Sequence, residues 1–570
     1  MGSLWGNVQD GPMADSQQTV DQISDRYLAD LAALDPLTAT YLGIPGDDDR
    51  MTDVSPAGWA ERAGLARRAV RDVDAADTDT DRERVAAAQL RERLGVELDL
   101  YDSGWLTADL ATAGCPMHSV RQIFDLMPAD SAEDWAVIAT RMRAVPESLN
   151  SYRAGLSHGA GAGRVAARRQ VVGCAERARG YAGAGSGPSF FAEFVQRFDR
   201  GGALRRELDE AAAGANEAYA GFAGFLTEQL LPVAPQREAV GRERYALASR
   251  YFTGTVLDLE ETYGWGWEEL ARIEAEMRST ARALTGAEDV EAAIVALDAD
   301  PARQLRGADG LQAWLQETSD EALHGLAGVH FDIPEPVRTL ECRISPTSGD
   351  GIYYTGPSED FSRPGRMWWS LPKGVDVHNT WREKTTVYHE GVPGHHLQVG
   401  QTAVRSQELN RFQRLLCWVS GHGEGWALYA ERLMQELGYL DEPGDRMGML
   451  DSQAFRAARV VLDIGMHLEL EIPTGAGMHE GERWTGQIGL EFLRAHAHMD
   501  DQLRQDEISR YLGGPGQAPS YKVGERVWLE CRQAAQQRHG DAFDLKAFHA
   551  AALNLGSMGL DPLREELARI

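Results

Sequence analysis

The spacing of hydrophobic residues predicts helices over most of the chain. Up to residue 330, apolar residues recur every three or four positions, which is the period of an amphipathic helix. The clearest segments are 20–34, 134–156 and 266–286. We therefore assign residues 14–330 to a helical lobe.

The pattern changes near residue 331. Three short segments, 337–344, 351–356 and 366–371, are rich in β-branched and aromatic residues and are flanked by Gly and Pro. Such segments are typical of the strands of a small sheet. Helical periodicity returns near residue 380. We therefore predict a mainly α fold, in which residues 331–570 hold a small sheet and the helices that carry the chemistry. The length of the chain allows one large domain or two lobes.

Composition narrows the class of protein. Of 570 residues, 43% are hydrophobic and 25% are charged, as in soluble globular proteins. The net charge of −30 argues against nucleic acid or an anionic membrane as a partner, because both would repel this surface. No apolar run approaches the roughly 18 residues that span a bilayer.

Two further features suggest a cytoplasmic protein. The first residues lack the basic and apolar regions of a secretory signal, and residues 1–13 are set aside as disordered or expression-derived. The five cysteines are far apart and form no CxxC pair, so we expect neither a disulfide framework nor a Cys-type zinc site.

The stretch "YHEGVPGHHLQ" at 388–398 contains the most suggestive chemistry. It holds His389, Glu390, His395 and His396, but position 393 is proline, so the zinc-hydrolase spacing His-Glu-x-x-His is absent. In a regular helix His389 and His395 would point ~120° apart, and His396 would lie ~10.5 Å further along the axis. Two imidazoles that share a zinc need nitrogens ~2.0–2.1 Å from the metal, so a straight helix suits neither pair.

An interruption of the helix would resolve this conflict. Pro393 cannot donate a backbone N–H, and the flanking Gly391 and Gly394 allow the backbone to bulge. A two-residue bulge would bring His395 to the place of the usual second histidine, although His396 stays open as the alternative. The competing interpretation is a helix–helix contact with hydrogen-bonded core histidines.

A third metal ligand is expected on the next helix, 420–437. Glu424 and Glu431 lie two turns apart on one face, with the apolar Ala427 and Leu428 between them. An unpaired buried carboxylate is costly, and coordination to a metal would remove that cost. The alternative is that both glutamates face solvent or pair with arginines.

Four motifs point to a family. "HEGVPGHHLQ", "GHGEGWALYAERL", "RAARVVLDIGMH" and "GGPGQAPSYKVGE" together resemble the bacterial family catalogued as domain of unknown function number 885. The His-Glu pair and distant helical glutamate also resemble the glutamate-ligand zinc peptidases. That resemblance implies a two-lobed helical body with a central channel, one Zn²⁺ held by His389, His395 and Glu424, and Glu390 as the base. His396 and Glu431 would then lie just outside the ligand set.

Further candidates come from the two C-terminal motifs. Tyr521, after a Gly/Pro loop, is our candidate to stabilise negative charge on the carbonyl oxygen, with a core tyrosine as the alternative. Lys522 beside it is one of few lysines in an arginine-rich chain. Arg459, Asp463 and His467 share a helix face. There Asp463 could orient a ligand histidine or Arg459 could clamp a substrate carboxylate, whereas a plain Arg–Asp pair is the alternative. We expect His467 in a supporting or core role.

These features favour a zinc-dependent hydrolase that cleaves peptide or related amide bonds in short substrates. A second hypothesis keeps the metal but assigns an amidohydrolase or biosynthetic reaction on one small molecule. A third is a metal-free binding protein on the same scaffold. The oligomeric state is left open.

Overall fold

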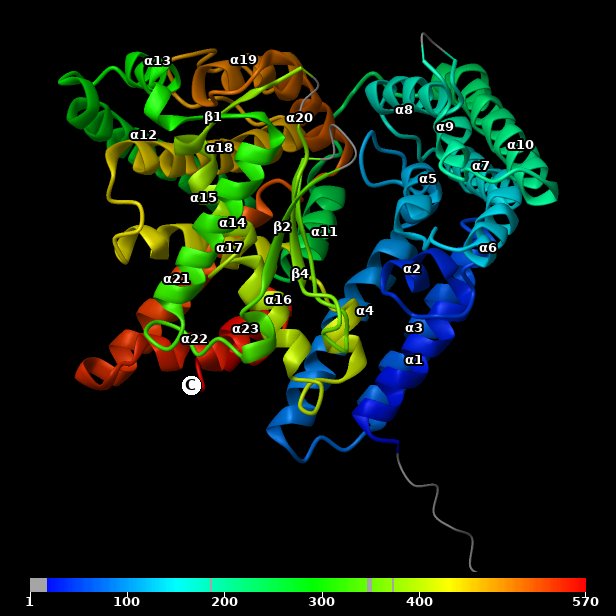
Figure 1. The fold of residues 1–570 in the computed structure, drawn as a ribbon, viewed down its shortest axis with the longest axis horizontal. Coiled ribbons are helices and arrows are strands. Elements are labelled where there is room, and N and C mark those ends of the chain that lie inside the picture. Colours follow the sequence, from blue (N-terminus) through cyan, green and yellow to red (C-terminus); the bar gives the residue numbers. More distant parts are fainter. Residues whose placement is uncertain (1–17, 185–186, 346–350, 372–373) are drawn as a thin grey trace, which may run out of the picture.

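The computed structural model describes residues 18–184, 187–345, 351–371 and 374–570. The segment 1–13 lies outside these residues. As predicted, the fold is mainly α, with a small sheet (Figure 1).

The first part of the chain is entirely helical. Its helices are α1 (Val20–Leu34), α2 (Pro36–Tyr41), α3 (Pro56–Ala75), α4 (Asp81–Ser103), α5 (Pro116–Leu126), α6 (Ala132–Arg143), α7 (Val145–Gly161), α8 (Arg168–Tyr181), α9 (Phe190–Gln196) and α10 (Ala203–Phe225). The predicted helix 134–156 is two helices, because Pro146 occupies the first turn of α7, where its missing N–H is tolerated.

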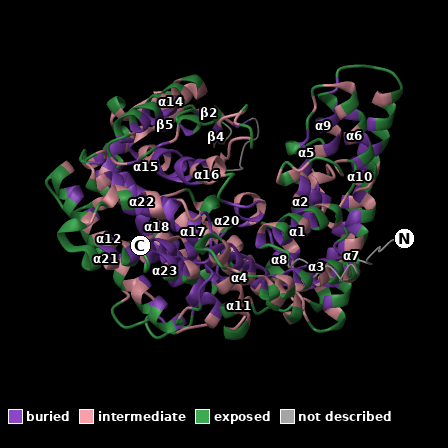
Figure 2. Ribbon diagram, turned by 90° about the horizontal axis from the view of Figure 1, so that it is seen from below, coloured by how far each residue is buried: buried purple, intermediate pink, exposed green. Residues whose placement is uncertain are grey.

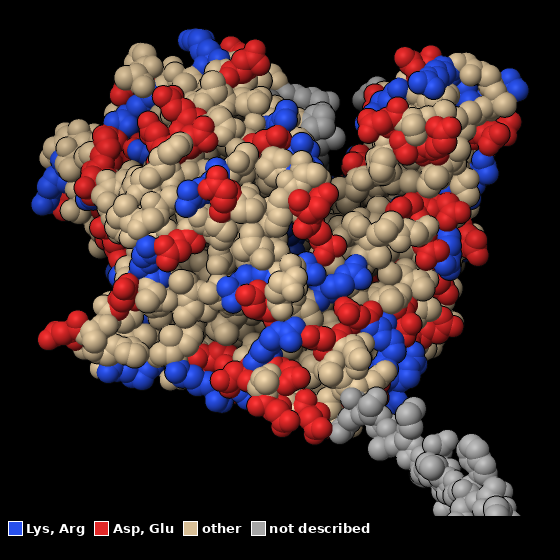
Figure 3. Space-filling model, turned by 60° about the horizontal axis from the view of Figure 1, so that its bottom comes forward, with Lys and Arg blue, Asp and Glu red and all other residues tan. Residues whose placement is uncertain are grey.

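Helices α5 to α10 form an arm with its own apolar core, beside the main body in Figure 1. The main body begins with α11 (Arg242–Thr253), α12 (Leu259–Thr285), α13 (Val290–Ala299) and α14 (Gly307–Leu326). The helices α12 to α14 share an apolar cluster with the sheet and the later helices. Helices α5 to α10 therefore pack in the core of the arm, and helices from α11 onward pack in the core of the body. This boundary comes before residue 331, where the pattern of hydrophobic residues changes. The surface is hollowed between the body and the arm (Figure 3).

All three predicted strands are present in a three-stranded sheet. They are β2 (Leu340–Ile344), β3 (Ile352–Thr355) and β4 (Gly365–Trp369), in the order β2-β4-β3. β4 runs parallel to β2 and antiparallel to β3. A separate antiparallel pair, β1 (Gln304–Arg306) and β5 (Val377–Asn379), was not predicted. β5 leads directly into the first helix of the candidate site.

The remaining helices complete the body. They are α15 (Thr380–Glu390), α16 (His395–Val404), α17 (Ser420–Glu436), α18 (Pro443–Leu468), α19 (Gly486–His496), α20 (Asp501–Gly513), α21 (Ser520–His539), α22 (Leu545–Leu553) and α23 (Leu560–Leu567). α15, α17 and α18 are largely buried in Figure 2, and α18 packs on α12 and α15. Of the residues described, no helix is both long and apolar enough to cross a bilayer.

Candidate metal centre

The predicted interruption is a complete break between two helices. α15 ends at Glu390, the Val392–Pro393 peptide is cis, and α16 begins at His395. Our expectation of a bulge inside one helix was therefore wrong. The turn is so tight that a Cβ on Gly394 would lie 1.9 Å from the carbonyl oxygen of His389, so only glycine fits.

This turn brings two imidazoles to one carboxylate. His389 Nε2 lies 3.3 Å from Glu424 Oε2, and His395 Nε2 lies 3.5 Å from the same oxygen. The two rings are 4.9 Å apart between centroids and nearly perpendicular, at 87°. Residues from α15, α16 and α17 thus converge on one point.

The three groups fit a tetrahedral metal ion. Ligand atoms ~2.0–2.1 Å from a tetrahedral Zn²⁺ are about 3.3–3.4 Å apart. The two distances to Glu424 match this spacing, and all three ligand atoms lie within 4.8 Å of one another. In the folded chain 9% of the His395 side-chain surface and 17% of the Glu424 side-chain surface are exposed, so the cluster reaches solvent.

Glu424 also owes its position to close contact between α17 and α21. A Cβ on Gly425 would lie 2.4 Å from the backbone of Gly524, and one on Gly524 would lie 1.9 Å from the Gly421 carbonyl oxygen. The glycines of the two motifs therefore let the helices touch backbone to backbone. This contact brings Tyr521 of α21 close to Glu424.

A second carboxylate orients His389 from behind. His389 Nδ1 lies 2.8 Å from Glu431 Oε1, and Thr385 Oγ1 donates to Glu431 Oε2 at 2.9 Å. Glu431 is almost fully buried. It holds the ring so that Nε2 points at Glu424, the arrangement by which carboxylates orient metal-ligating histidines.

Electrostatics favour positive charge at this point. Burial alone would lower the pKa of His389, but hydrogen bonds with Glu424 and Glu431 raise it to about 10. Burial also opposes ionisation of Glu424, and the hydrogen bonds with His389 and His395 nevertheless hold its pKa well below the ordinary value. The carboxylates that stabilise a proton on His389 would equally stabilise a divalent cation that displaces it.

His396 lies outside this cluster. Its Nδ1 lies 3.0 Å from the Tyr354 hydroxyl on β3, and its Nε2 donates to the carbonyl oxygen of Val337 at 2.7 Å. Burial lowers the pKa of His396 to about 4, so it is a neutral histidine that joins α16 to the sheet. Of the two alternatives, the structure thus brings His395 to Glu424.

Glu390 is buried beside His389 and His395. Burial raises its pKa, and the neighbouring His395 and His389 oppose that rise. A raised pKa makes a carboxylate a better proton acceptor, which suits Glu390 to general acid–base catalysis at this candidate site.

Tyr521 lies near Glu424 and Arg459. Burial and the negative charge of Glu424 raise the pKa of Tyr521 to about 12, so its hydroxyl keeps its proton and can donate it in a hydrogen bond. The guanidinium of Arg459 lies 5.0 Å from the centre of its ring.

Asp463 neither orients a histidine of the cluster nor pairs with Arg459, the two roles that the sequence suggested. Its Oδ2 accepts hydrogen bonds from the Tyr245 hydroxyl and the Gly516 backbone N–H, each at 2.8 Å. Asp463 therefore anchors the Gly/Pro loop that precedes Tyr521. Arg459 pairs with Glu507 at 3.0 Å instead of Asp463, which removes the simple Arg–Asp pair.

His467 and Lys522 have structural contacts of their own. His467 is fully buried and donates to the Tyr511 carbonyl oxygen at 3.0 Å, so it matches the expected core role. Lys522 is buried too, and its ammonium is held by Glu269, Glu525 and Gln453. It joins α12, α18 and α21, with no contact to the histidines or Glu424 among the bonds of the described residues.

The comparisons with known proteins agree with this architecture. The family model described as "Bacterial protein of unknown function (DUF885)" matches residues 36–567. The chain belongs to this family. Its fold is similar to a crystal structure described as a "putative lipoprotein" from Colwellia psychrerythraea, with a TM-score of 0.83, 22% identity, and 96% of this chain and 98% of that chain covered.

A second structure is also similar to this DUF885 chain. It is described as a "putative lipoprotein of unknown function" from Shewanella oneidensis, with a TM-score of 0.74, 18% identity, and coverage of 96% and 99%. At these identities the likeness concerns the fold alone. A comparison with curated proteins returned no match.

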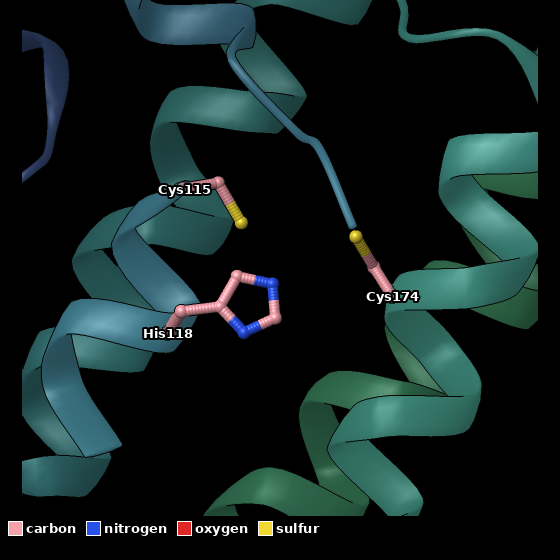
Figure 4. A group of neighbouring side chains, drawn as sticks. All are labelled: Cys115, His118 and Cys174. Atoms are coloured by element: carbon pink, nitrogen blue, oxygen red, sulfur yellow. The ribbon is translucent and has the colours of Figure 1, made fainter. Parts of the chain in front are cut away.

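The DUF885 chain holds another group of potential ligands that sequence analysis missed. Cys115, His118 and Cys174 face one another inside the arm, with ligand atoms within 4.8 Å (Figure 4). The C-x-x-H spacing at 115–118 was a usable signal, but Cys174 comes from the distant α8. His118 already uses both nitrogens, on the Tyr181 hydroxyl and the Ala111 carbonyl oxygen. Both partners of His118 lie outside its group, whereas Nε2 of His389 contacts Glu424, a member of its own group, so the His389 cluster is the better candidate metal site.

Glu431→Gln tests the support behind His389. Glutamine keeps the size of the side chain but removes the charge that fixes the imidazole. We expect zinc affinity to fall about 10- to 100-fold, measured by competition with a chelator of known affinity. The control is Glu436→Gln, a glutamate on α17 with 46% side-chain exposure. Equal zinc affinities for the two variants would contradict the role assigned to Glu431.

Proposed function

We propose that this protein is a zinc-dependent hydrolase that cleaves peptide or related amide bonds in short substrates. One observation carries the proposal: His389 and His395 converge on Glu424, with Glu390 beside them. Two histidines and one glutamate form a ligand set known from catalytic zinc sites, which leave one position open. A purely structural ion is more often enclosed by four protein ligands.

The bound ion would supply Lewis acidity, which polarises a carbonyl group and acidifies water. The chain's own residues supply the proton transfers and the stabilisation of negative charge. Glu390 takes the proton from the attacking water and returns it to the leaving nitrogen, which its raised pKa allows. The protonated Tyr521 donates a hydrogen bond to the oxygen on which negative charge develops.

The supporting residues keep these groups in place. Glu431 fixes the ring of His389, and Asp463 fixes the loop before Tyr521. The central channel and the cytoplasmic location remain predictions, and the two similar structures described as lipoproteins make export the competing location.

A substrate screen tests the reaction class. Zinc-loaded protein is incubated with short peptides, N-blocked peptides and non-peptide amides, and products are identified by mass spectrometry. We expect new termini from short peptides, lost when zinc is removed and restored when it is returned. Turnover of a non-peptide amide alone would favour the small-molecule amidohydrolase instead. No turnover by protein that holds one zinc per chain would contradict the hydrolase proposal.

Tyr521→Phe tests the hydrogen-bond donor. The substitution removes one hydroxyl and keeps the ring that stacks near Arg459. We expect kcat to fall by about 10²- to 10³-fold, as for the loss of one oxyanion donor, with zinc content unchanged. A variant with normal kcat would make Tyr521 a core tyrosine, the alternative that the sequence left open.

A further inference from the structure

Two arginines beside the candidate metal centre have unused hydrogen-bonding capacity. Both lie on α18, one turn apart. Among the described residues, Arg456 Nε and Arg459 Nη1 are buried atoms without a hydrogen-bond partner. Leaving a buried donor unpaired is costly. Several other arginines of the described residues also hold such an atom, so these two are distinguished by their place beside the candidate site.

Arg459 is the fixed member of the pair. Its Nη2 donates to Glu507 at 3.0 Å, its Nε donates to the Tyr511 hydroxyl at 3.1 Å, and only 7% of the residue is exposed. These contacts hold its guanidinium over the ring of Tyr521, 5.0 Å from the centroid. Its remaining donor, Nη1, is therefore held rigidly near the candidate catalytic tyrosine.

Arg456 is the unpaired member. Its one hydrogen bond among the described residues is a long contact of 3.5 Å from Nη1 to the Ser452 carbonyl oxygen, and no carboxylate there lies within 4.0 Å of it. Arg456 lies one turn of α18 from Arg459, whose guanidinium is over the Tyr521 ring. Burial acts to raise the pKa values of Glu390, Glu431 and Tyr521, and the positive charge of Arg456 opposes that effect in all three.

On this side of the site the arginines outnumber the carboxylates that pair with them. Arg510 joins the two arginines and shares Glu507 with Arg459, through bonds of 3.0 and 2.8 Å. Two guanidinium groups thus share a single carboxylate, and Arg456 beside them has no carboxylate within 4.0 Å among the described residues. An arginine without a carboxylate partner beside reacting groups is suited to bind one, through two parallel hydrogen bonds.

We propose that Arg456, supported by Arg459, binds a carboxylate of the substrate and so sets which amide bond reaches Glu390. This inference rests on the proposed function. It predicts substrates in which a free carboxylate lies close to the cleaved bond, such as short peptides cut near the C-terminus or N-acyl amino acids. The carboxylate is either the terminal one or that of an acidic side chain.

A binding experiment tests the proposal without turnover. Succinic acid monohydroxamate and its primary amide both carry a metal-chelating hydroxamate, but only the first carries a carboxylate. Affinities for zinc-loaded protein are measured by calorimetry with the native chain, Arg456→Gln, and the control Arg446→Gln, which alters an arginine of α18 that pairs with Asp441. We expect the acid to bind at least about 10-fold more tightly than the amide, or about 1.4 kcal/mol. This preference should vanish in Arg456→Gln and persist in Arg446→Gln.

The other outcomes separate the possible errors. If acid and amide bind the native chain equally, the carboxylate subsite is wrong while the metal centre stands. If Arg456→Gln weakens both probes equally, Arg456 is a structural residue and the inference fails. If neither probe binds zinc-loaded protein, the proposed function fails with it.

Hydrolysis then identifies the source of the carboxylate. Matched peptides differ in a free or amidated C-terminus, or in Asp against Asn next to the cleaved bond. A fall in kcat/KM of about 10-fold or more on amidation assigns the terminal carboxylate, and the same fall on the Asp-to-Asn change assigns the side chain. Peptides that are cleaved with equal kcat/KM in both comparisons would overturn the inference.

Discussion

Glu390→Gln is expected to lose almost all turnover and to keep its zinc. The amide of glutamine cannot take a proton from water, and general acid–base catalysis contributes about 10²- to 10⁴-fold to such reactions. Because Glu390 is not one of the three converging groups that could hold the ion, zinc binding should not depend on its charge. The measurement is kcat on whichever substrate the screen yields, together with zinc per chain by elemental analysis.

Two results would contradict the role of Glu390. A normal kcat would remove it as the base, and loss of zinc would make it a ligand. Glu408→Gln, a change at a glutamate with 52% side-chain exposure that pairs with Arg405, is the control for removing one negative charge. It should retain both activity and zinc.

His395→Ala is expected to lose zinc, and His396→Ala is expected to lose stability. His395 contributes one of the two imidazoles that face Glu424, so its removal should lower bound zinc to near zero. His396 contributes hydrogen bonds with Tyr354 and Val337, so its removal should leave zinc bound and destabilise the fold. An unpaired buried group costs about 1–3 kcal/mol, which is measurable by denaturant unfolding.

The neighbouring histidines control for each other. They are adjacent in sequence, belong to the same helix and are both buried. Zinc loss in His396→Ala with zinc retained in His395→Ala would reverse the assignment. Equal zinc loss in both variants would indicate that the turn between α15 and α16 collapses, and the milder His396→Gln would then decide whether its hydrogen bonds alone are required.

Much of this site could be predicted because its residues are close in sequence and unusual in type. The Gly-Val-Pro-Gly interruption signalled a change of direction between His389 and His395, and the buried helix around Glu424 signalled a carboxylate that needs a partner. The form of the break could not be predicted. Whether proline and two glycines bulge a helix or end it depends on the contacts of the flanking segments.

Other contacts depend on residues far apart in the chain. The spacing of Arg459 and Asp463 correctly placed both on α18. Their partners, Glu507 and Gly516, come from α20 and the following loop, which no helical period identifies. The strands β1 and β5 span three residues each, too few for an alternating pattern to stand out.

The structure also defines what a metal-free protein would look like. In that case His389 would carry a proton between Glu424 and Glu431, as its pKa of about 10 allows, and the cluster would be an internal ion pair. A buried ion pair of this kind does not by itself show that the cluster stabilises the fold, because the cost of burying two charges can exceed their attraction. A protein that is fully folded and zinc-free after purification in zinc-containing buffer would support this alternative.

An anomalous-scattering map at the zinc edge tests the central claim most directly. For crystals of the native chain grown with zinc, we predict one strong peak about 2.0–2.1 Å from His389 Nε2, His395 Nε2 and a Glu424 oxygen. An empty position there, or a single peak between Cys115, His118 and Cys174, would contradict the account.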